Sequence, residues 1–145
     1  MENEKESAMK AKKMMEESKL FSEEEIKGVE DMIMSTRVSF DSEGMKQSFV
    51  DNNNYLTLII ADADVANLGI DSDYYWVCTE DLMREVFKIN YPSRDQMISF
   101  LNGSLKLLKN HNYFTIEAQD RYQNQQTNFE YTKRKLAELI NQALV

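Results

Sequence analysis

The sequence predicts an all-α protein of about six helices in a single domain that covers residues 1–145. Only four glycines and one proline occur among the 145 residues, which is too few for a sheet with many tight turns. Apolar residues recur at intervals of three and four along most of the chain, and no segment is a clear β-strand. Hydrophobic residues make up 42% of the sequence and charged residues 29%, a balance typical of a globular protein.

The first two predicted helices cover residues 4–20 and 23–36. Ser22 and Glu25 have the spacing of a capping box, which separates the two helices and starts the second. Each helix carries an apolar stripe among charged residues, as expected when one face is buried. The stripes consist of Ala8, Ala11, Met15, Ile26, Val29 and Ile33.

Residues 37–53 are predicted to form a loop, with a short helix near residues 45–50. The apolar residues of this stretch are too irregularly spaced to fix a period. A third helix is expected over residues 54–67, and Gly69 suits a left-handed C-terminal cap for it. Residues 55–60 are as apolar as any in the sequence, so a core element is expected there.

Capping residues and apolar spacing predict the last three helices. Asp71 or Asp73 can cap the fourth helix, and Pro92 forces the chain out of it. Ser93 and Gln96 form a second capping box, which opens the fifth helix. The three helices are expected over residues 71–90, 93–108 and 116–143.

Charge and composition restrict the expected partners and location. The net charge is −8, and no face carries the surplus of Lys and Arg that binding to nucleic acid requires. No run approaches the ~18 apolar residues of a membrane span, and the N-terminal segment has no apolar signal region. The single cysteine, Cys78, excludes an intramolecular disulfide and is expected to be a buried thiol. These features predict a cytoplasmic protein without nucleic-acid or membrane partners.

Asp62 and Asp64 lie inside an otherwise apolar segment, residues 61–69. A buried carboxylate needs a metal, a cation or several hydrogen bonds to compensate it. Two residues apart on a helix, these side chains point about 200° apart, so one faces inward. Asp64 shares a face with Ile60 and Leu68 and is the better candidate. The two hypotheses are a metal or phosphate site, and a structural role in which one acid binds a loop or helix N-terminus while the other is solvated.

Three segments follow one another in an order that carries a resemblance: residues 3–8 (Asn-Glu-Lys-Glu-Ser-Ala), residues 26–36, and residues 62–69 (Asp-Ala-Asp-Val-Ala-Asn-Leu-Gly). This order resembles the C-terminal portion of HD-superfamily metal-dependent phosphohydrolases of the small bacterial type. The resemblance implies an HD-like helical bundle that lacks its leading helices. Later residues that also fit are Tyr74, Tyr75, Arg94, Phe100, Leu101, Tyr113, Phe114, Thr115, Asn128 and Glu130.

The family holds its metal with a His, an adjacent His-Asp pair and a later Asp, and the resemblance maps the last of these onto Asp64, with Asp62 as its neighbour. The His and the His-Asp pair have no counterpart here. The only histidine, His111, lies in a polar turn and is expected at the surface. A hydrolytic metal needs about three or four protein ligands, so one Asp holds at most a weakly bound Mg²⁺. No catalytic or cofactor-binding residue is therefore assigned.

Three functions remain open. The first is a degenerate or N-terminally shortened relative that has lost hydrolysis and acts as a binding or self-associating module, because missing helices would expose apolar faces. The second is a phosphohydrolase of nucleotides or other phosphate esters whose missing ligands come from another chain. Asp64 would then hold Mg²⁺, Mn²⁺, Ni²⁺ or Co²⁺, with Asp62, Arg84 and Glu85 around it. The third is a helical protein of similar architecture only, whose acidic surface steers a basic protein partner.

Overall fold

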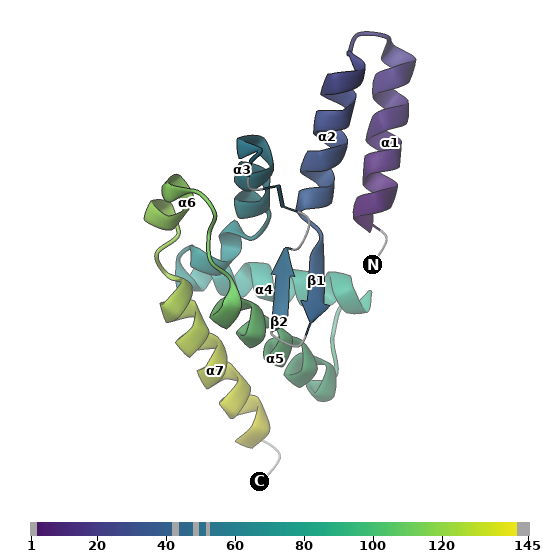
Figure 1. The fold of residues 1–145 in the computed structure, drawn as a ribbon. Helices are drawn as coiled ribbons and strands as arrows, with labels where there is room; N and C mark the ends of the chain where they lie inside the picture. Colours follow the sequence, from purple (N-terminus) through teal and green to yellow (C-terminus); the bar gives the residue numbers. More distant parts are fainter. Residues whose placement is uncertain (1–2, 42–43, 48–49, 52, 142–145) are drawn as a thin grey trace.

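The computed structural model describes residues 3–41, 44–47, 50–51 and 53–141. Seven α-helices make up most of these residues, so the predicted all-α class is confirmed (Figure 1). The helices are α1 (Asn3–Ser18), α2 (Glu23–Ser35), α3 (Tyr55–Asp64), α4 (Ser72–Phe87), α5 (Arg94–Asn110), α6 (Ile116–Arg121) and α7 (Gln125–Asn141). A 3-10 helix, η1 (Ala66–Gly69), follows α3, and β1 (Val38–Asp41) pairs with β2 (Gly44–Gln47). None of the described helices is long and apolar enough to cross a membrane.

Helices α1 and α2 form an antiparallel helical hairpin that extends away from the other helices (Figure 1). The predicted capping box is confirmed. The Ser22 backbone N–H donates to Glu25 Oε2 at 2.7 Å, and the Glu25 backbone N–H donates to Ser22 Oγ at 3.2 Å. Ala8 and Ile26, both expected on inner faces, are buried. Helix α2 also packs on α3, which connects the hairpin to the rest of the chain.

Two antiparallel strands occupy residues 38–41 and 44–47, where a loop and a short helix are predicted from sequence. The prediction of helix is wrong for residues 45–47, while residues 48–49 lie outside the described residues. The Gln47 side chain, 7% exposed, donates from Nε2 to the Ala61 carbonyl at 2.9 Å and anchors β2 to α3. Strands of only four residues are too short to produce a recognisable apolar period in the sequence. The position of this strand pair also depends on its contact with α3.

Gly69 lies at a close crossing of two chain segments, which interrupts two of the predicted helices. The predicted helix over residues 54–67 ends early as α3 and continues as η1, and the predicted helix over residues 116–143 is divided into α6 and α7. The Asn124 N–H donates to the Gly69 carbonyl at 3.1 Å, and this hydrogen bond joins the two segments where they cross. Gly69 does not adopt the left-handed conformation expected of a C-terminal cap. Instead its missing side chain lets its backbone lie against Tyr122.

Most of the buried apolar side chains of the described residues belong to two clusters. One surrounds η1, and its buried members are Val65, Leu68, Tyr75, Leu108, Tyr113 and Ala118. The other lies between α4, α5 and α7, and its buried members are Met83, Leu101 and Leu136. Cys78 on α4 is half-buried, so the expectation of a fully buried thiol is wrong.

The fully buried Asn128 side chain of α7 holds the η1 segment in place. Its Nδ2 donates to the carbonyls of Leu68 at 3.0 Å and Ile70 at 2.9 Å, while its Oδ1 accepts from Ser72 Oγ at 2.7 Å. These bonds satisfy the amide, and they tie two segments almost 60 residues apart in the sequence. Asn128 therefore has a structural role in this fold.

Candidate functional site at the end of α3

Asp62, rather than Asp64, is the buried acid of α3. Its side chain is 2% exposed and shares a buried helix face with Thr57 and Ala61. The prediction that Asp64 faces inward is therefore wrong. Both acids have apolar neighbours at helical spacing, and the choice between them depends on where the loop before α6 lies, which local spacing does not encode.

Three donors surround the Asp62 carboxylate. The Phe114 backbone N–H donates to Oδ1 at 2.8 Å, and the Thr115 backbone N–H and hydroxyl donate to Oδ2 at 2.8 Å and 2.7 Å. Hydrogen bonds from backbone N–H groups compensate a buried carboxylate as a cation would. Thr115 is in turn the N-cap of α6, and its Oγ1 accepts from the Ala118 N–H at 3.2 Å. Asp62 therefore orders the turn before α6, which is the structural alternative considered above.

Asp64, the residue onto which the resemblance places a metal ligand, is exposed. It lies one helical turn after Ile60 and two turns after Leu56, on the outward face of α3. Partial burial of its carboxylate raises the pKa of Asp64 above its usual value, and the negative charge of Glu4 raises it further. The first turn of α1 therefore repels the acid at the end of α3, and a cation placed near Asp64 would relieve this repulsion.

The described residues do not assemble the predicted metal site. They contain no group of three or more His, Cys, Asp and Glu side chains that could hold a metal ion. Arg84, considered for the surroundings of Asp64, instead pairs with Asp81 at 2.7 Å and Glu80 at 3.5 Å on its own helix. Glu4 is the acid whose charge acts on Asp64, and two carboxylates are fewer ligands than a tightly bound metal needs.

His111 is buried, with 7% of its surface exposed, so the expectation of a surface residue is wrong. Its ring packs edge-on against Tyr113, with ring centroids 4.9 Å apart, and also against Phe114. Burial lowers the pKa of His111, and the Asp62 charge opposes this effect. The aromatic residues that follow it in sequence are the signal that could have placed it in the core. His111 is therefore a buried residue that packs beside the turn that binds the Asp62 carboxylate.

An exposed apolar face on α3 was not predicted from the sequence. Tyr55, Leu56, Ile59 and Ile60 are 53%, 56%, 41% and 36% exposed. They form two i, i+4 pairs, so they are contiguous on one side of the helix, and Asp64 follows them there. Single exposed apolar residues are common in soluble proteins, whereas a contiguous group of four is a candidate interaction surface. We call Tyr55, Leu56, Ile59, Ile60 and Asp64 the α3 face.

No family model, no curated protein and no solved structure matches this chain. The resemblance to HD-superfamily phosphohydrolases therefore depends on the residues quoted above alone. The α3 face and its terminal carboxylate are the features on which a function can be argued.

Proposed function

We propose that this chain is a self-associating binding module that pairs with a second copy through the α3 face and does not hydrolyse phosphate esters alone. The observation that supports it is the exposure of four large apolar side chains on one side of a helix whose other side is buried. Leaving that surface in water is unfavourable, and covering it with a second apolar surface removes the penalty.

A second copy can be placed on the α3 face with a two-fold axis at the midpoint of the face. Its midpoint lies between Ile59 and Ile60. In an antiparallel pair related by a two-fold axis, Ile59 of each copy meets Ile60 of the other, and Leu56 meets Ala63. An isologous dimer of this kind needs no further surface to close.

The same pairing brings the Asp64 end of one α3 to the Tyr55 end of the other, where the helix dipole is positive. The first turn of α3 itself contains no acidic residue. Glu117 of α6 nevertheless accepts a hydrogen bond from the Tyr55 hydroxyl at 3.0 Å, so a negative charge also lies at that end. The pairing therefore depends on the apolar contacts of the α3 face and not on the charge of Asp64.

We expect a weak dimer whose population rises with concentration across the micromolar range, because one ten-residue helix provides a small interface. Ile59→Lys should weaken association roughly a hundredfold or more, since it places a charge against the apolar Ile60 of the other copy at both symmetric contacts. Sedimentation velocity over a concentration series measures the dimer population of the parent protein and the loss of association in the Ile59→Lys variant.

Val86→Lys on α4 is the matched control. Val86 is also an apolar side chain on a helix surface, 56% exposed, and it lies outside the α3 face. The dimer of the Val86→Lys variant should form as in the parent protein. A parent protein that stays monomeric throughout the series, or two variants that dissociate equally, would refute association through α3.

The second candidate function is a metal-dependent phosphohydrolase completed by a different chain. The resemblance that maps a metal-binding acid onto Asp64 favours it, and a cation near Asp64 would offset the charge of Glu4, which raises the pKa of Asp64. A second copy cannot supply the missing ligands, since the only histidine of the chain is buried beside Tyr113 and Phe114. The two functions therefore require different partners.

Metal analysis and a phosphatase assay separate the two candidates. We expect the purified chain to contain no stoichiometric transition metal and to show no turnover of p-nitrophenyl phosphate with Mn²⁺, Mg²⁺, Ni²⁺ or Co²⁺. Weak Mg²⁺ binding in calorimetry, abolished by Asp64→Ala, is compatible with either candidate function. Stoichiometric transition metal, or turnover that Asp64→Ala abolishes, would instead establish the phosphohydrolase and exclude the non-hydrolytic module.

A further inference from the structure

A cavity of about 460 Å³ lies between α4, α5 and α7, and none of its lining residues belongs to the α3 face. Its volume falls within the range of roughly 300–1,000 Å³ that is typical of small-molecule sites. The apolar part of its lining comes from Met83 and Leu101, 3% and 0% exposed, together with Met97 and Leu139. The cavity thus has a rigid apolar floor supplied by the second core cluster.

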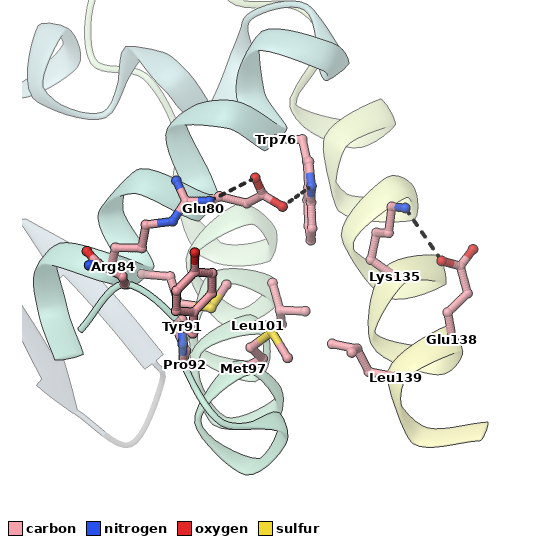
Figure 2. Close-up of a pocket in the computed structure, with 12 residues that line it drawn as sticks. Trp76, Glu80, Arg84, Tyr91, Pro92, Met97, Leu101, Lys135, Glu138 and Leu139 are labelled. Atoms are coloured by element: carbon pink, nitrogen blue, oxygen red, sulfur yellow. Dashed lines mark hydrogen bonds and ion pairs between the residues drawn. The ribbon is translucent and has the colours of Figure 1, made fainter. Parts of the chain in front are cut away.

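Two aromatic side chains flank this cavity. Trp76 of α4 is held in place, because its Nε1–H donates to Glu80 Oε1 at 2.9 Å and its ring packs against Tyr131 at a centroid distance of 5.7 Å. Figure 2 shows the indole edge-on, with Lys135 on one side and Tyr91 and Arg84 on the other. Tyr91 precedes Pro92 in the connection from α4 to α5 and is 92% exposed.

These two aromatic groups have different roles in binding. Flat rings gain energy from offset or edge-on contacts with Trp and Tyr beyond the burial of apolar area. Trp76 is held in place and forms one side of the site. Tyr91 packs against almost nothing in the protein, so its side chain is free to move over a bound ligand. A planar aromatic ring is therefore the shape that this site favours.

The charges at the rim select a neutral ligand. Two cations and two acids line the cavity, and they pair with one another or with Asp81. Arg84 contacts Glu80 at 3.5 Å, and Lys135 contacts Glu138 at 3.5 Å. A charged ligand would have to separate one of these pairs and would meet a like charge at the same rim.

Glu80 adds one polar preference. Its carboxylate accepts the Trp76 N–H and contacts Arg84, but a carboxylate has about four lone-pair positions. It can therefore accept a further hydrogen bond from a ligand O–H or N–H. We propose that the cavity between α4, α5 and α7 is a binding site for a neutral planar aromatic molecule that carries one hydrogen-bond donor.

The single tryptophan of the chain makes the proposal directly testable, because the Trp76 Nε1–H gives one indole signal in a ¹⁵N–¹H spectrum. The probes are 2-naphthol, 2-naphthoate, 2-naphthylmethylammonium and the saturated decahydro-2-naphthol. We expect 2-naphthol to shift the Trp76 signal saturably, and the anion, the cation and the saturated alcohol to bind several-fold more weakly. No saturable shift with 2-naphthol, or equal binding of all four probes, would overturn the proposal.

Tyr91→Ala should weaken 2-naphthol binding about tenfold, the loss expected from one aromatic contact. Tyr74→Ala is the matched control, since Tyr74 is a 64% exposed tyrosine of α4 that does not line the cavity. Both side chains are exposed, so neither change should unfold the protein. Equal affinity in the two variants would show that Tyr91 does not close the site and would contradict the proposal. Failure here leaves the α3 dimer unaffected, because the two sites share no residue.

Discussion

Gly69→Ala should destabilise the folded protein by about 3 kcal/mol. An added Cβ would lie 2.2 Å from the Tyr122 carbonyl oxygen, 2.5 Å from Tyr122 Cβ and 2.7 Å from Tyr122 C. None of these atoms belongs to a flexible side-chain end, so the two segments must separate. Separation would also strain the hydrogen bond between the Asn124 N–H and the Gly69 carbonyl. Urea unfolding monitored by circular dichroism measures the change.

Gly103→Ala provides the matched control for that substitution. Gly103 lies inside α5, and apart from its chain neighbours and the nearby backbone of its own helix, no heavy atom of the described residues lies within 4 Å of an added Cβ. Alanine is the better helix former there, so this variant should be stabilised by about 0.5–1 kcal/mol. If Gly69→Ala lowers the free energy of unfolding by less than about 1 kcal/mol, the segments that cross at Tyr122 can move apart easily. That result would contradict the expected clash between the added Cβ and the rigid atoms of Tyr122.

Asp62→Asn should destabilise the protein by about 2–4 kcal/mol, and this is the second large effect. Three donors of Phe114 and Thr115 converge on the two carboxylate oxygens. An amide keeps one oxygen but places an NH₂ group against donors, so at least one buried N–H loses its acceptor. Because Thr115 caps α6, fraying of α6 should accompany the loss. Thermal unfolding combined with hydrogen exchange at the α6 amides tests both effects.

Asp64→Asn is the control, two residues away on the exposed side of the same helix. The pKa of Asp64 is raised in the folded protein, so the charged form is disfavoured there. A raised pKa of an acid contributes stability at low pH that is lost as the pH rises through the folded value. Removing this charge should therefore be neutral or slightly stabilising at pH 7. The comparison belongs in the Ile59→Lys background, where association does not contribute. Equal losses for the two variants would contradict the assigned roles of the acids.

Local sequence signals predicted most helix starts but not the chain crossings. The capping boxes at Ser22 and Ser93 form as expected, because each involves residues only three positions apart. Asp71 also caps α4, as one of the two alternatives predicted. By contrast, the division between α6 and α7 lies where Tyr122 packs against Gly69, which is more than 50 residues away. No local pattern carries that information.

The candidate site was predictable in its location but not in its detail. The unusual placement of Asp62 and Asp64 in an apolar segment correctly indicates that one acid is buried and needs partners. Which acid it is depends on the Phe114–Thr115 turn. The apolar character of residues 55–60 suggests a core helix, yet the structure leaves one side of α3 uncovered. Hydrophobicity alone does not distinguish a buried face from an exposed interaction face.

The contacts of Asn128 also impose an order on how this protein can be made. The amide of Asn128 satisfies the carbonyls of Leu68 and Ile70, and the Asn124 N–H satisfies that of Gly69. During synthesis these carbonyls cannot reach their final partners until residues 124–128 have left the ribosome. Helices α1 and α2 can pair much earlier, because their contacts are local. The nascent chain should therefore remain open around η1 until α7 is available to pack on it.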